Sequence, residues 1–144
     1  MCAKEKMSDK DVWGKIKIGD AVSFKTIISR DRVVDFVSLS GDRNPLHSDR
    51  KVAQKRGFKK PISHGMLLAS YFSVLVGEYF LKDHNLYLSQ NIDFIKPVFI
   101  GETITVRGKI SSKMESLRIL EIETVILNKK GGKVVKGTAR VKYI

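Results

Sequence analysis

Asp42 and His47 place a carboxylate and an imidazole close enough in the chain to act together as a general acid–base pair. They lie in the run GDRNPLH, residues 41–47, one on each side of Pro45. Proline fixes its own φ angle and restricts the residue before it, so this loop is stiffer than its length suggests. A stiff loop suits positioned acid–base groups, and we expect the two side chains to converge.

The motif PISHGM, residues 61–66, could supply a third chemical group. Gly65 has no side chain that would block its backbone N–H, and it lies where an apolar helix begins. The first N–H groups of a helix lack intrahelical partners and can stabilise developing negative charge. A base, an acid and an oxyanion donor together are the set needed to add water across a double bond conjugated to a carbonyl.

Structural roles and other chemistries compete with this interpretation. An aspartate after glycine most often ends a helix and bonds its own backbone, although a cap does not need a histidine five residues later. His64 is expected to be structural. A metal site built from Asp42, His47 and His64 has suitable ligand types but no compact spacing of histidines or cysteines, so no metal is expected. Cys2 lies in the N-terminal segment, and no GxSxG elbow is present, so a nucleophile is not expected.

The secondary structure that must position these motifs follows from periodicity. Residues 21–28 alternate as a strand, and Ser29 suits the N-cap of a helix whose apolar stripe ends at Gly41. A short helix is predicted at 49–56, and residues 66–80 are apolar nearly all round, which predicts a helix enclosed by other structure. Four further stretches alternate as strands, at 86–99, 102–111, 117–127 and 133–143. We therefore predict an α+β fold in which one antiparallel sheet curls around the apolar helix.

Length and composition are typical of one soluble domain. The chain has 144 residues, of which 42% are apolar and 29% charged. We expect a flexible segment at 1–11 and a single domain at 12–144. The apolar run at 66–80 is too short to cross a bilayer, the N-terminus lacks the apolar region of a secretory signal, and the single cysteine excludes an internal disulfide framework. These features predict a cytoplasmic protein with no membrane partner.

The formal charge of +12 indicates a surface that attracts anions. The lysines and arginines are scattered, with no basic helix and no interleaved aromatic ladder, which argues against nucleic-acid binding. A phosphate-bearing carrier such as coenzyme A, or an acidic acyl carrier protein, would use the same field. Candidates to meet carrier phosphates are Arg56, Lys59, Lys60 and Lys96, and ordinary solvation is the alternative for each.

Three segments resemble the R-specific enoyl-CoA hydratases of the MaoC-like family: SLSGDRNPLHSD, PISHGMLLAS and LYLSQNIDFIKPVFIGETITV. The similarity extends from Phe36 to Val106, and the pattern G-D-x-N-P-hydrophobic-H is highly specific. The resemblance implies a hot-dog fold and the reversible hydration of trans-2-enoyl-CoA to (R)-3-hydroxyacyl-CoA, without a metal or redox cofactor. It also implies a homodimer or a larger homo-oligomer.

The same resemblance implies roles for individual residues. Asp42 and His47 match the pair that holds and activates the water added to the β-carbon and returns a proton to the α-carbon. Gly65 matches the residue whose N–H polarises the thioester carbonyl. Asn44 is expected to brace the loop, and Ser73 is expected to orient the catalytic groups from the helix.

Two alternative functions remain open. One is a dehydratase that acts on an acyl-carrier-protein thioester or on an unusual acyl-CoA. The other is a hot-dog module that binds acyl-CoA without chemistry, although pure binding would not require the acid–base pair.

Overall fold

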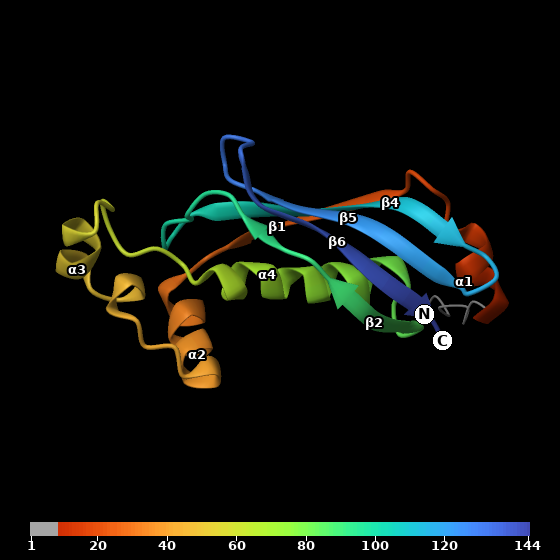
Figure 1. The fold of residues 1–144 in the computed structure, drawn as a ribbon, viewed down its shortest axis with the longest axis horizontal. Helices are drawn as coiled ribbons and strands as arrows, with labels where there is room; N and C mark the ends of the chain where they lie inside the picture. The colour runs from red at the N-terminus through yellow and green to blue at the C-terminus, as the bar shows by residue number, and fades with distance from the viewer. Residues whose placement is uncertain (1–8) are drawn as a thin grey trace, which may run out of the picture.

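A long antiparallel sheet wraps a central helix in the computed structural model, which describes residues 9–144 (Figure 1). This is the hot-dog arrangement of an α+β fold, as expected from the sequence. In chain order the elements are α1 Asp9–Lys15, β1 Ala21–Ile27, α2 Arg30–Ser40, η1 Pro45–His47, α3 Arg50–Lys55, α4 Gly65–Val74, η2 Leu75–Phe80, β2 Asn85–Gln90, β3 Asp93–Phe94, β4 Thr103–Met114, β5 Ile119–Leu127 and β6 Lys133–Tyr143.

The strands pair in the order β1-β4-β5-β6-β2, and β3 also pairs with β6. Every one of these pairings is antiparallel. The strands β4, β5 and β6 form the middle of the sheet, and their alternating buried residues face the central helix. The sheet therefore supplies a continuous apolar surface on which the helix rests.

Helix α4 and the π-helical segment η2 that continues it lie along this surface (Figure 1). Phe72, Leu75 and Val76 are at most 1% exposed and join the strand residues in one core. Gly108 on β4 lets the two layers meet, because a Cβ there would lie 2.7 Å from Leu75 Cδ2 and 2.8 Å from Phe80 Cε2. The absence of a side chain at this position thus sets how closely the helix approaches the sheet.

The apolar helix is covered on one side only. Met66, Val74 and Tyr79 on α4 and η2 are 58%, 39% and 45% exposed. The prediction that other structure encloses the helix is therefore confirmed where the sheet lies, and wrong for the opposite side within one chain.

Helix α2 begins and ends where the sequence predicts. Ser29 Oγ accepts the Arg32 N–H at 3.3 Å, and Gly41 donates its N–H to Val37 O at 2.8 Å. Gly41 has a φ of 79°, which favours glycine, so the chain leaves the helix here and enters the GDRNPLH loop. In Figure 1, α3 lies beyond the end of the sheet and α2 projects below that same end, where α4 begins.

The predicted strand at 86–99 is two separate strands, of which β3 has only two residues. Side-chain hydrogen bonds attach the segment between them to the sheet. Gln90 Nε2 donates to Thr124 Oγ1 at 3.0 Å, and Asn91 Oδ1 accepts the Thr138 N–H at 2.9 Å. Polar side chains therefore supplement a single backbone bond, from Asn91 N–H to Thr138 O at 3.2 Å, where the regular ladder is interrupted, which the alternating pattern did not reveal.

The strand predicted at 102–111 is longer than expected, because β4 continues to Met114 and takes up part of the gap before the strand predicted at 117–127. Lys113 Nζ donates to the backbone carbonyls of Trp13 at 2.9 Å and Ile16 at 3.0 Å. This polar end of the strand therefore attaches the last turn of α1 and the residue that follows the helix to the sheet.

The predicted flexible segment, residues 1–11, falls largely outside the described residues, and residues 9–11 belong to α1. Within residues 9–144, no helix is long and apolar enough to cross a membrane.

Candidate active site

The GDRNPLH loop is held by hydrogen bonds between its own residues. Asp42 donates its N–H to Ser40 Oγ at 3.2 Å, and Asn44 donates its N–H to Asp42 Oδ1 at 3.1 Å. Asn44 Oδ1 in turn accepts the Leu46 N–H at 3.1 Å, where η1 begins. Asn44 thus braces the loop from both ends, in the manner typical of Asx turns.

His47 is anchored through one ring nitrogen. Its Nδ1 lies 2.7 Å from Ile62 O, and a carbonyl oxygen can only accept, so Nδ1 carries the proton and Nε2 is left with a free lone pair. Ile62 is itself fixed, because its N–H donates to Leu46 O at 3.3 Å and it bridges to Phe99. The anchor leaves His47 with the nitrogen that a general base needs.

The structure brings Asp42 and His47 together. A carboxylate oxygen of Asp42 and one ring nitrogen each from His47 and His64 all lie within 4.8 Å of one another. Two groups up to about 5.5 Å apart can share one water molecule at normal hydrogen-bond lengths. The Asp42 side chain is 51% exposed, so solvent reaches the pair.

Gly65 is the first residue of α4, and the N-cap residue before it makes no side-chain capping bond. Within the described part of the chain, no acceptor takes the Gly65 N–H. A Cβ at Gly65 would lie 2.8 Å from Phe94 Cε1 and 2.9 Å from Phe94 Cδ1, so the aromatic ring rests directly on this position. The site therefore has an unused donor at a helix N-terminus, and a ring that excludes larger residues.

His64 is the site residue that sequence reasoning underestimated. It is 2% exposed, its Nε2 lies 3.2 Å from Asp42 O and 3.9 Å from Asp42 Oδ2, and its ring stacks on His47 with centroids 3.7 Å apart. Burial lowers the pKa of this imidazole; the hydrogen bond to Asp42 acts in the opposite direction, and His47 lowers it again. His64 is therefore neutral at pH 7. The only feature of the sequence that could have indicated a place for His64 in the site is its position directly before Gly65.

The same three side chains are the donors that a metal ion would need. The Nδ1 of His47 is anchored to a carbonyl, as the second nitrogen of a metal-bound imidazole usually is. The Nδ1 of His64, by contrast, is buried without a partner, and its Nε2 is already bonded to Asp42 O. His64 therefore lacks the hydrogen bond to its second nitrogen that usually orients a metal-bound imidazole. The cluster fits acid–base chemistry better than metal binding.

Ser73 is not brought to the pair. It lies on α4, exposed, eight residues after Gly65, which is about 12 Å along the helix axis. In residues 9–144, no hydrogen bond or ion pair joins it to Asp42 or His47. Its role in orienting the catalytic groups stays a prediction.

The four cations proposed for carrier binding separate into three places. Lys59 and Lys96 line one groove of about 450 Å³ together with Lys129 and Lys130 from the β5–β6 turn. Lys60 lines a different cavity, and Arg56 is the C-cap of α3 and lines neither. Lys129 and Lys130 lie between the strands predicted at 117–127 and 133–143, and the sequence did not single them out as candidates for carrier binding.

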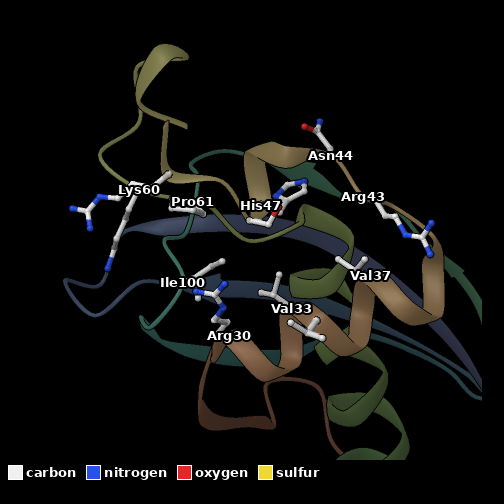
Figure 2. Close-up of a pocket in the computed structure, with 12 residues that line it drawn as sticks. Arg30, Val33, Val37, Arg43, Asn44, His47, Lys60, Pro61 and Ile100 are labelled. Atoms are coloured by element: carbon white, nitrogen blue, oxygen red, sulfur yellow. The ribbon is translucent and has the colours of Figure 1, made fainter. Parts of the chain in front are cut away.

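The second cavity, of about 550 Å³, opens beside His47, between α2 and the segment around Pro61 (Figure 2). Its apolar wall consists of Val33, Val34, Val37, Pro61 and Ile100. Its cations are Arg30, Arg43, Arg50 and Lys60. Among the described residues, no ion pair compensates these four charges. The cavity suits a ligand with an apolar body and a negative charge.

The sheet-wrapped helix, with Asp42, His47 and His64 clustered at its first turn, defines the class of this protein, a hot-dog protein with a carboxylate and two imidazoles gathered at one end of the central helix. Residues 15–131 match the family described as MaoC like domain, and the chain belongs to this family.

The relatives that the chain resembles are enzymes by name. The chain is 35% identical to an (R)-specific enoyl-CoA hydratase of Aeromonas caviae, over 88% of this chain and 95% of that protein. It is 30% identical to a mitochondrial 3-hydroxyacyl-(acyl carrier protein) dehydratase of Solanum lycopersicum, over 86% of this chain and 75% of that one. The solved structure of the (R)-hydratase from A. caviae superposes with a TM-score of 0.87, at 35% identity, covering 90% of this chain and 98% of the other.

Proposed function

We propose that this protein reversibly hydrates trans-2-enoyl-CoA to (R)-3-hydroxyacyl-CoA. As a member of the MaoC-like family, it is a hydratase or dehydratase that acts on an acyl thioester. The observation that carries the proposal is the cluster of an Asp42 carboxylate oxygen and a His47 ring nitrogen within 4.8 Å, next to Gly65, whose N–H has no acceptor among residues 9–144.

One water molecule held between Asp42 and His47 supplies both the hydroxyl group and the proton that are added to the alkene. An O–H bond of the water breaks, the proton passes to the pair, and the oxygen bonds to the β-carbon of the enoyl group. The pair then returns the proton to the α-carbon on the same face, so the elements of water are added syn. The Gly65 N–H polarises the thioester carbonyl while negative charge develops on its oxygen.

The direct test is an assay of the purified protein with crotonyl-CoA. The expected result is loss of the ultraviolet absorbance of the enoyl thioester, with (R)-3-hydroxybutyryl-CoA as the product in a chiral separation. Binding of the thioester without absorbance loss would instead support a non-catalytic module. Formation of the (S) product would contradict the proposed facial geometry.

The second candidate is a dehydratase that acts on acyl-carrier-protein thioesters, as the name of the tomato relative describes that protein. The same assay with crotonyl groups on coenzyme A and on acyl carrier protein separates the two. A kcat/KM that is higher for the protein-bound thioester would favour this candidate.

We propose that the groove defined by Lys59, Lys96, Lys129 and Lys130 binds the phosphates of the carrier. Four lysines and one carboxylate, Glu102, give it a net positive charge. It adjoins Phe99, which bridges to Ile62, the residue that anchors His47. The groove and the active site are therefore connected through Phe99 and Ile62, so a carrier bound in the groove would lie near His47.

The double variant Lys129→Gln/Lys130→Gln is expected to raise KM for crotonyl-CoA about fivefold, because two surface charges that meet phosphates are lost. The kcat should be unchanged, and the increase should shrink at high ionic strength. A crotonyl thioester of N-acetylcysteamine, which has no phosphate, should show no change. Lys17→Gln/Lys142→Gln removes the same charge outside this groove and is the matched control. An equal rise of KM in the control would assign the effect to net charge alone.

We also infer that a second copy of this chain covers the exposed side of α4, as expected for a homodimer. Exposed apolar side chains continue from Met66 and Val74 to the edge strand β2, where Leu86 and Leu88 are 50% and 43% exposed. An apolar surface next to an unpaired strand edge favours association with another chain. Sedimentation of the purified protein at twice the monomer mass is the expected result.

A further inference from the structure

His64 contacts both members of the catalytic pair, although the proposed reaction assigns it no proton. Its ring stacks on His47 at an interplanar angle of 30° with centroids 3.7 Å apart. Its Nε2 lies 3.2 Å from the backbone oxygen of Asp42. On a further side, the ring of Phe36 contacts it, with centroids 4.9 Å apart. One buried imidazole thus contacts both Asp42 and His47.

The tautomer of His64 follows from its partners. The Asp42 carbonyl oxygen can only accept, so Nε2 carries the proton and donates it. The other nitrogen, Nδ1, is buried and has no partner. The titratable groups that face the ring are the Asp42 carboxylate at 3.9 Å and the stacked His47. A neutral ring in this tautomer satisfies the bond to Asp42 without placing a positive charge against the His47 ring.

We propose that His64 is a positioning residue for the hydration reaction, which fixes the plane of the His47 ring by stacking and the main chain of Asp42 by its Nε2–H bond. The inference rests on the proposed function. His47 has a single hydrogen bond at Nδ1, about which its ring could still rotate, and stacking removes that freedom. Asp42 has a half-exposed side chain in a loop, and the bond to its carbonyl holds that loop against α4. Reacting groups displaced by about 1 Å lose up to a hundredfold in rate.

Two variants separate the two contacts. His64→Phe keeps an aromatic ring that can stack on His47 but has no donor for Asp42 O. His64→Gln keeps an amide donor but has no ring, and His64→Leu loses both contacts. We expect kcat for crotonyl-CoA to fall about tenfold in each of the first two and about a hundredfold in His64→Leu, with KM within about twofold of the parent. A rise of KM at constant kcat would contradict a role in positioning the acid–base pair.

A spectroscopic signature distinguishes positioning from a loss of folded protein. Nitrogen-15 imidazole spectra should show His47 as the Nδ1–H tautomer in the parent and in His64→Phe. In His64→Gln and His64→Leu, an increased share of the Nε2–H tautomer is expected, because the unstacked ring leaves Ile62 O part of the time. If His64→Leu does not fold, His64→Phe carries the kinetic test and His64→Gln the spectroscopic one. The control is His84→Phe, the same change at a histidine outside the site, with parental kcat and spectrum expected.

The outcomes for His64 and for the proposed function are distinguishable. Parental kcat in His64→Leu, with an active parent, would overturn the positioning role and leave the hydration chemistry untouched. An inactive parent would overturn the proposed function, while the His47 tautomer would still report whether His64 orders that ring. A fall in kcat that matches the unfolded fraction, with an unchanged His47 spectrum, would assign His64 to stability alone.

Discussion

Asp42→Asn is expected to lower kcat for crotonyl-CoA hydration by roughly 10²- to 10⁴-fold while the protein remains folded. The amide has the shape of the carboxylate but no basic oxygen, so the bound water loses one of the two groups that hold it and exchange its proton. The loop should survive, because the amide oxygen can still accept the Asn44 N–H that Asp42 Oδ1 accepts at 3.1 Å. The measurement is a steady-state assay together with a thermal melt.

Asp35→Asn is the matched control for this variant. Asp35 lies exposed on α2, seven residues before Asp42. Its replacement by Asn removes the same charge outside the site. Its kcat should equal that of the parent. Parental activity in Asp42→Asn would show that the carboxylate takes no part in the proton transfer, and the hydration mechanism described above would be wrong.

His47→Gln is the second large effect that we expect, again roughly 10²- to 10⁴-fold in kcat, because glutamine cannot exchange a proton near pH 7. Its amide can still donate toward Ile62 O, which His47 Nδ1 contacts at 2.7 Å, so the loss should be chemical rather than structural. Steady-state kinetics of this variant and of the double variant Asp42→Asn/His47→Gln are the measurement.

The double variant tests whether the two residues act on one water. Groups that act as a unit have non-additive effects, so the double variant should be no slower than the slower single variant by more than about threefold. Multiplied losses would mean that Asp42 and His47 act in separate steps. That result would contradict the shared water while leaving the assignment of each residue intact.

Local signals predicted much of the fold. Ser29 and Gly41 bound α2 because capping and a positive φ depend on a few adjacent residues, and the loop that follows inherits its stiffness from Pro45. The alternation of β6 at 133–143 matched the observed strand for the same reason. Features that depend on neighbouring residues can be read from one sequence.

Features that depend on distant residues could not be read in this way. The contact of His64 requires a ring 17 positions earlier to lie against it, and the lysine groove requires Lys96 to lie near Lys129 and Lys130, which are more than 30 positions later in the chain. The break between β2 and β3 depends on Asn91 reaching the backbone of Thr138. Each of these is a tertiary contact, and the hydrophobic period carries no information about it.

The ring of Phe94 over Gly65 has a consequence for how this protein can diversify. Phe94 is 53% exposed and belongs to the two-residue strand β3, so it covers Gly65 and takes no part in the buried interior. Exchanging this one aromatic residue would reshape the surface beside Gly65 without repacking the core. Variants at this single surface position could therefore differ in the acyl groups that they accept, while the fold stays the same.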